Sequence, residues 1–64
     1  MNSVERRVSI RERLAASSAP LKGAELASLY SVSRQIIVQD IAVLRAEGAR
    51  IVATPQGYLL LTRE

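Results

Sequence analysis

The chain has 64 residues, which is enough for one small domain with a modest hydrophobic core. It contains no cysteine and no histidine, which excludes disulfides, thiolate metal sites, cysteine nucleophiles and histidine-based catalytic triads. Nine Lys and Arg residues against six Asp and Glu residues give a net charge of +3 and a pI near 10.2, a balance typical of nucleic-acid-binding domains.

No apolar run is long enough to cross a membrane. The densely charged start from Met1 to Arg13 does not resemble a secretory signal. We therefore expect a cytoplasmic location.

The first predicted helix runs from about Ser3 to Ser17. Ser3 is the expected N-cap, and Glu5 lies in the first turn, where negative charge suits the helix dipole. Ile10 and Leu14 are four residues apart and form the clearest core pair.

A second apolar stripe on this helix consists of Val4, Val8 and Ala15. The more conservative explanation is packing against the strands at the C-terminal end of the chain. The alternative is a docking surface for another subunit or domain.

A break ending at Pro20 and a brief extended piece, Leu21-Lys22, lead to a short second helix. This helix covers Gly23 to Leu29, with Gly23 acceptable at its cap and Glu25 in its first turn. The residues expected to face the core are Leu26 and either Leu29 or Tyr30.

A tight turn then precedes a long helix that begins at Ser33, the expected N-cap, and ends at Gly48. Val32 is placed to fill the core from the turn. The buried face consists of Ile37, Ile41 and Leu44, and the opposite face of Gln35, Gln39, Ala42 and Ala46. Two helices joined by such a turn make a helix-turn-helix.

Two short strands are predicted after Gly48, at Ile51 to Thr54 and Tyr58 to Thr62, with Pro55-Gln56-Gly57 as the turn. A hairpin in this place is the wing of a winged helix-turn-helix. The expected fold is therefore mainly α with a small β-hairpin, as one domain over residues 1–64.

This order of elements resembles the winged helix-turn-helix domains of bacterial and archaeal regulators, over about residues 4 to 62. The stretches that carry the resemblance are Leu21-Lys22-Gly23-Ala24-Glu25-Leu26-Ala27 and Val32-Ser33-Arg34-Gln35. A closer similarity to niacin-responsive transcriptional repressors lies in Ser33 to Ala46 followed by Ile51 to Tyr58.

The niacin resemblance implies an N-terminal domain that binds operators of NAD-synthesis or niacin-uptake genes. It also implies a C-terminal domain with metal-binding histidines that senses nicotinic acid. The chain stops at Glu64 without a histidine, so we expect no cofactor here: nicotinic acid and the metal ion would belong to a missing effector domain. A biotin-operon-type or other metabolite-responsive regulator is the alternative within the same class.

The early residues of the second helix of a helix-turn-helix meet base edges in the major groove. A glutamine amide can pair with adenine, so Gln35 and Gln39 are the candidate readers. Ile36 and Val38 flank them and could contact thymine methyl groups or be partly buried. If Ile36 and Val38 contact thymine methyl groups, then together with the glutamines they predict an operator that is rich in A·T pairs.

The candidate backbone contacts surround this helix. Arg34 at its start can reach a phosphate or a guanine, and Lys22 with the first N–H groups of the second helix can clamp a phosphate. Arg50 and the Thr54 to Tyr58 tip of the hairpin would reach the flanking backbone or minor groove. The complete set of predicted DNA-binding residues is Lys22, Ser33, Arg34, Gln35, Ile36, Val38, Gln39, Arg50, Thr54 and Gln56. Asp40 would repel DNA, so we expect it to pair internally with a basic residue.

Two other classes of protein are alternatives for this sequence. A winged helix that binds proteins would tend to lose its basic face, whereas Arg34, Lys22 and Arg50 favour double-stranded DNA. An enzyme lacks a candidate site, because Ser31 and Ser33 are turn and cap residues without a general base. We expect a monomer or weak dimer for these 64 residues and a homodimer for a full-length regulator.

Overall fold

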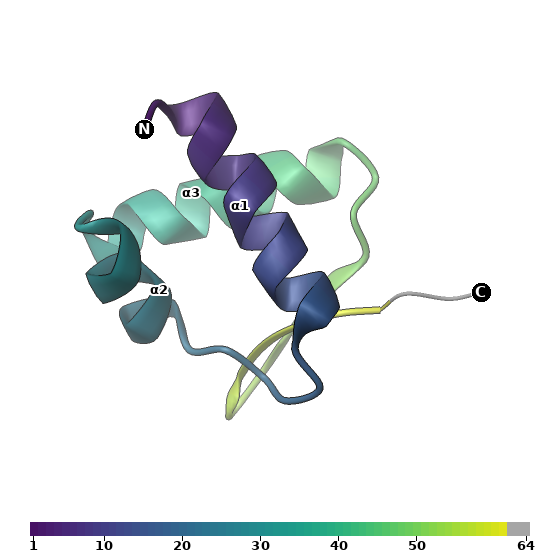
Figure 1. The fold of residues 1–64 in the computed structure, drawn as a ribbon. Helices are drawn as coiled ribbons and strands as arrows, with labels where there is room; N and C mark the ends of the chain where they lie inside the picture. Colours follow the sequence, from purple (N-terminus) through teal and green to yellow (C-terminus); the bar gives the residue numbers. More distant parts are fainter. Residues whose placement is uncertain (62–64) are drawn as a thin grey trace.

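The computed structural model describes residues 1–61, and its elements follow the predicted order (Figure 1). The helices and strands are α1 (Ser3–Ala16), α2 (Gly23–Tyr30), α3 (Arg34–Ala46), β1 (Ile51–Thr54) and β2 (Gly57–Leu60). Three helices followed by an antiparallel hairpin confirm the winged helix-turn-helix fold. Within the described part of the chain, no helix is both long and apolar enough to cross a membrane.

The starts of α1 and α2 differ by one residue from the predicted caps. Asn2 caps α1: its Oδ1 accepts from the Glu5 N–H at 2.8 Å, and Glu5 Oε1 accepts from the Asn2 N–H at 3.1 Å. Ser3 is already helical, so the prediction that it caps the helix was wrong. In α2 the cap position belongs to Lys22, whose N–H donates to Glu25 Oε1 at 3.1 Å, and Gly23 is the first helical residue.

Both predicted ends of α3 are confirmed. The Ser33 hydroxyl accepts from the Ile36 N–H at 3.2 Å. At the other end Gly48 has φ +104°, and the N–H groups of Gly48 and Ala49 donate to the carbonyls of Arg45 and Leu44, each at 3.0 Å. This is the Schellman arrangement, in which a left-handed residue stops the helix.

In the turn between α2 and α3 a left-handed residue also ends a helix, but this residue is a serine and not a glycine. Ser31 has φ 57° and ψ 43°, and the following N–H, of Val32, donates to the Ala27 carbonyl at 3.0 Å. Val32 is partly buried against the core, as predicted. The sharp reversal at Ser31 therefore sets the direction in which α3 leaves α2.

The core lies between the three helices and the base of the hairpin, and α1 crosses in front of α3 in Figure 1. Its buried members are Ile10, Leu14, Leu26, Ala27, Ile37, Ile41, Leu44, Ala49 and Ile51. At the end of α2, Leu29 is 51% exposed, whereas Tyr30 packs against the core. The Tyr30 hydroxyl is hydrogen-bonded to Ser9 Oγ at 2.7 Å, which links α2 to α1.

The second apolar stripe of α1 is not packed against the strands. Val4 is 61% exposed and Val8 is 52% exposed, so that expectation was wrong. The reason is rotational: α1 turns Ile10 and Leu14 fully inward, and Val4 and Val8 lie on another face. The docking alternative stays a hypothesis.

The hairpin pairs Ile51 with Leu60 and Thr54 with Gly57, so only two residues form its tip. The second strand starts one residue earlier than predicted and ends at Leu60, and the predicted end at Thr62 lies outside the described residues. Leu21 adds a single bridge to Tyr58: the Leu21 N–H donates to the Tyr58 carbonyl at 3.0 Å, and the Tyr58 N–H donates back at 2.8 Å. The extended piece before α2 is thus fastened to the wing.

Candidate nucleic-acid interface

The outer face of α3 brings four predicted residues together. Arg34, Gln35, Val38 and Gln39 are all exposed and line one shallow hollow on the helix surface. They occupy successive turns because residues three and four apart share a helix face. The side opposite Ile37 and Ile41 is therefore open along the first half of α3.

The inner face of α3 carries a buried charged residue, Asp40, which is paired with arginines of α1. Asp40 is 2% exposed, and its Oδ2 and Oδ1 accept from Arg6 Nε and Nη2 of α1, the latter at 3.0 Å. Arg7 Nη1 lies 3.6 Å from Asp40 Oδ1. The prediction of an internal ion pair is confirmed, and the hydrogen bond to Asp40 raises the pKa of Arg6 above its ordinary value.

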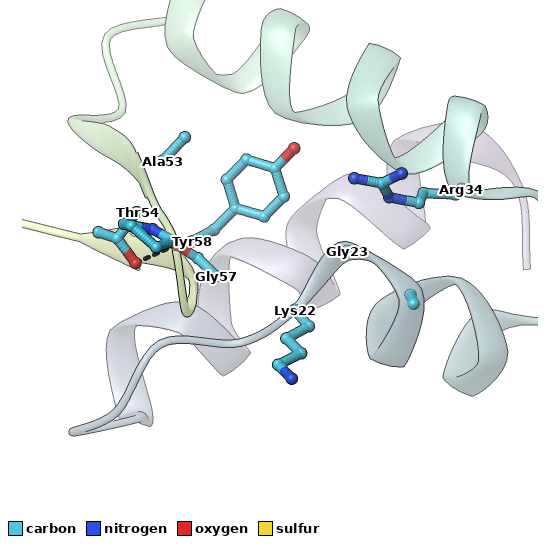
Figure 2. A pocket seen from close by; sticks show the side chains of 9 residues that line it. Lys22, Gly23, Arg34, Ala53, Thr54, Gly57 and Tyr58 are labelled. Atoms are coloured by element: carbon cyan, nitrogen blue, oxygen red, sulfur yellow. Dashed lines mark hydrogen bonds between the residues drawn. The ribbon is translucent and has the colours of Figure 1, made fainter.

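A second hollow lies where the start of α2, the start of α3 and the wing meet (Figure 2). It is an open concavity lined by Lys22, Gly23, Ala24, Arg34, Ala53, Thr54, Pro55, Gly57 and Tyr58. Three of these, Lys22, Arg34 and Thr54, belong to the predicted set of DNA-binding residues. Arg34 borders both hollows, so the two form one continuous surface from α3 to the wing.

Among residues 1–61, no acidic side chain lines either of the two hollows. Asp40 is buried, and a carboxylate oxygen of Glu25 is bonded to the backbone at the start of α2. By contrast, the groove between α1 and the end of α3 is lined by Glu12 and Glu47 as well as by arginine. The surface formed by the hollows therefore suits a polyanion better than the α1 groove does.

Several predicted side chains have their polar atoms occupied by local bonds. The Thr54 hydroxyl donates to the Gly57 carbonyl at 2.8 Å and accepts from the Gln56 N–H at 3.1 Å, which shapes the tip of the wing. The Ser33 hydroxyl caps α3. The side chain of Gln56 is exposed at the tip.

Ile36 and Val38, which flank the glutamines of α3, differ in how far they are exposed. Ile36 is partly buried, whereas Val38 is 47% exposed and lines the hollow with the glutamines. Arg50 lies at the opposite end of the hairpin from its tip, where its carbonyl accepts from the Leu61 N–H at 2.8 Å. Arg50 is exposed but lines neither hollow.

The sequence predicted that the hairpin tip from Thr54 to Tyr58 reaches DNA, but not that Tyr58 lines one hollow with Arg34 and Gly23. Gly23 was assigned only as a cap. The proximity of Tyr58 and Gly23 depends on the Leu21–Tyr58 bridge, which joins distant parts of the chain. The only local signal was the glycine preceding Tyr58, since a strand glycine often marks a close approach of another backbone.

Comparisons with known proteins agree with this geometry. The family model described as "HTH domain" matches residues 6–59. Over 56 residues, 88% of this chain, the sequence is 59% identical to the probable transcription repressor NiaR of Thermotoga maritima. Over 45 residues, 70% of this chain, it is 53% identical to the transcription repressor NadR of Bacillus subtilis.

The matches cover 32% of the NiaR relative and 25% of the NadR relative, so the chain corresponds to a minor part of each. The resemblance to niacin-responsive repressors stated from the sequence is thus confirmed for this part. The chain belongs to the HTH domain family, and it is a DNA-binding helix-turn-helix domain, not an enzyme, related to the transcription repressors NiaR and NadR.

Proposed function

We propose that this domain is the operator-reading part of a transcription repressor, with α3 in the major groove and the wing against the flanking backbone. The observation that carries the proposal is the surface that runs from α3 to the wing through Arg34, whose two hollows are lined by no acidic side chain among residues 1–61. The match to two repressors over most of the chain supports the same role.

Base reading falls to the exposed residues in the first half of α3. Gln35 and Gln39 each carry an amide that can pair with the N6 and N7 positions of adenine. Val38 lies between them in the hollow and offers an apolar contact for a thymine methyl group. Ile36, being partly buried, has a smaller share in this contact. These choices favour an A·T-leaning half-site.

Backbone contacts fall to the elements around α3. Arg34 at the first turn is the main candidate for a phosphate, and Lys22 with the first N–H groups of α2 is the second. In Figure 2 the Lys22 side chain extends away from Arg34 and Tyr58, so the two cations would serve different phosphates. The wing tip at Thr54 and Gln56, and Arg50 at its base, would follow the flanking backbone.

The regulator to which this domain belongs would respond to nicotinic acid and control NAD biosynthesis or niacin uptake, as the relationship to NiaR and NadR suggests. It would bind paired half-sites as a homodimer. Among residues 1–61 no group of three or more His, Cys, Asp or Glu side chains is placed to hold a metal ion. Effector and metal binding would fall to parts of the regulator beyond this domain.

The decisive test measures affinity for a duplex against salt concentration by fluorescence anisotropy. Arg34→Ala should weaken binding and reduce the slope of log affinity against log salt by about one unit. Arg11→Ala, which removes an exposed arginine from α1, is the matched control and should leave the slope unchanged. No binding to any duplex at low salt would contradict the proposal.

The base contacts are tested by selecting bound sequences from a random duplex pool. Wild type should return A·T-rich half-sites, and Gln39→Ala should relax the preference at one position, at a cost of about 1–3 kcal/mol on the preferred site. G·C-rich half-sites would exclude the assignment of Gln35 and Gln39 to adenine.

A further inference from the structure

Tyr58 and Arg34 come together beside Gly23. The position that a β-carbon on Gly23 would occupy lies 3.5 Å from Tyr58 Cε2 and 3.6 Å from Arg34 Nε. In Figure 2 the Tyr58 ring extends from the hairpin toward α3, and the Arg34 guanidinium points back toward the ring. Three elements therefore converge where Gly23 has no side chain.

Tyr58 is the fixed member of this pair. Its backbone is held on one side by the strand partner Ala53 and on the other by the two hydrogen bonds to Leu21. Its ring is partly buried and packs against the hydrophobic core. The ring is thus a rigid surface at the rim of the hollow.

Arg34 is the adaptable member. It is exposed, and among residues 1–61 the ion pairs are formed by Arg6 and Arg7 with Asp40, so no carboxylate holds the Arg34 guanidinium. A long side chain that is free in the unbound domain loses rotamer entropy when it is fixed on a ligand. An aromatic surface that fixes the guanidinium beforehand removes part of that cost.

We propose that Tyr58 is a positioning residue for DNA binding: its ring holds the Arg34 guanidinium at the rim between α3 and the wing, directed at a phosphate. This inference rests on the proposed DNA-binding function. The phenol hydroxyl is not required for it, because the ring supplies the contact.

The first test uses the salt dependence of duplex binding. Tyr58→Leu keeps an apolar side chain against the core but removes the ring, and neither residue carries a charge. Affinity at low salt should fall about tenfold, the effect of one charge-assisted hydrogen bond, and the salt slope should fall by about one unit. A neutral substitution can change the slope only by displacing a cation from a phosphate. Tyr58→Phe keeps the ring and should retain the wild-type affinity and slope.

The second test is a double-mutant cycle. If Tyr58 acts through Arg34, the variant that combines Arg34→Ala with Tyr58→Leu should bind no more weakly than Arg34→Ala alone. Losses that add up, together with an unchanged slope for Tyr58→Leu, would overturn the inference and leave Tyr58 as a packing residue only.

The third test uses two substitutions at Gly23, which lies beside Arg34 and Tyr58. It does not depend on whether Tyr58→Leu folds. A β-carbon alone fits at ordinary van der Waals distances, so Gly23→Ala should lower the affinity less than Gly23→Val does. Gly23→Val adds two further carbons between Arg34 and Tyr58 and should show the reduced affinity and slope of Arg34→Ala. Wild-type binding by Gly23→Val would overturn the inference.

The outcomes separate this inference from the function on which it rests. If wild type binds no duplex at low salt, the proposed function itself fails. If wild type binds and Arg34→Ala lowers the slope, while Tyr58→Leu and Gly23→Val keep it, only the positioning role is wrong. An unchanged slope for Arg34→Ala also removes the positioning role, because Arg34 then contacts no phosphate.

Discussion

The two flanks of α3 use arginine for different purposes. On the flank toward α1, Arg6 and Arg7 form ion pairs with the buried Asp40, so their charge is balanced within the domain. On the flank toward the wing, Arg45 donates to a backbone carbonyl and Arg34 is exposed. The comparison teaches that a basic composition alone does not identify a binding surface, because Arg6 and Arg7 pair with Asp40 whereas Arg34 is exposed beside the predicted reading residues.

The largest effect is expected on the α1 flank. Arg6→Ala removes the bidentate partner of a buried carboxylate and leaves only the more distant Arg7, so the free energy of unfolding should fall by about 3 kcal/mol. Urea denaturation measures this change. Arg11→Ala, an exposed arginine of the same helix, should change it by less than about 0.5 kcal/mol. Equal effects of the two substitutions would show that the Asp40 pair does not stabilise α1 on α3.

The next effect concerns the attachment of the wing. A β-carbon at Gly57 would lie 2.6 Å from the Leu21 carbonyl, and φ is +138°, so Gly57→Ala should cost about 2 kcal/mol of folding stability. DNA affinity should fall as well, since the wing and Tyr58 must shift. Gly48→Ala is the control, with φ +104° and open space around it, and should cost about 1 kcal/mol without loss of affinity. Equal costs would mean that Leu21 does not confine the wing.

A smaller effect is expected from the bond between α3 and the base of the wing. Arg45 Nε donates to the Ile51 carbonyl at 2.9 Å, so Arg45→Met, which keeps an apolar stem, should lower the free energy of unfolding by about 1 kcal/mol. Thermal and urea unfolding both report this change. Arg50→Met is the matched exposed control and should be near neutral.

The smallest effect is the change with pH in the contribution of Arg6 to the free energy of unfolding. The pKa of Arg6 is raised by the hydrogen bond to Asp40, and a raised pKa on a cation gives stabilisation that is present below its ordinary value and lost only above it. The stability difference between wild type and Arg6→Ala should therefore stay constant between about pH 7 and pH 9. A difference that shrinks across this range would contradict the assignment.

Features set by local chemistry were predictable from the sequence. Ser33 and Gly48 were identified as the ends of α3, because a cap hydroxyl and a left-handed glycine act within a few residues of their own positions. The hairpin followed from β-branched residues around Pro55-Gln56-Gly57 for the same reason. The shift from Ser3 to Asn2 shows the limit, since both residues are good caps and only the observed backbone separates them.

Features set by contacts between distant residues were not predictable. The choice of Tyr30 over Leu29 for the core depends on how α2 is rotated against its neighbours. The hollow around Arg34 and Tyr58 depends on where the hairpin lies relative to α2. For the same reason the sequence suggested that Asp40 pairs with a basic residue but could not identify Arg6 and Arg7 as the partners.

The bridge between Leu21 and Tyr58 has a consequence for the order of folding. It joins a residue before the helix-turn-helix to one near the C-terminal end, so closing it costs loop entropy that contacts between adjacent helices do not. We expect the helices to pack first and the wing to dock late. Substitutions at Gly57 should then accelerate unfolding while leaving the folding rate nearly unchanged, and the wing should be the first part of the domain to open to hydrogen exchange.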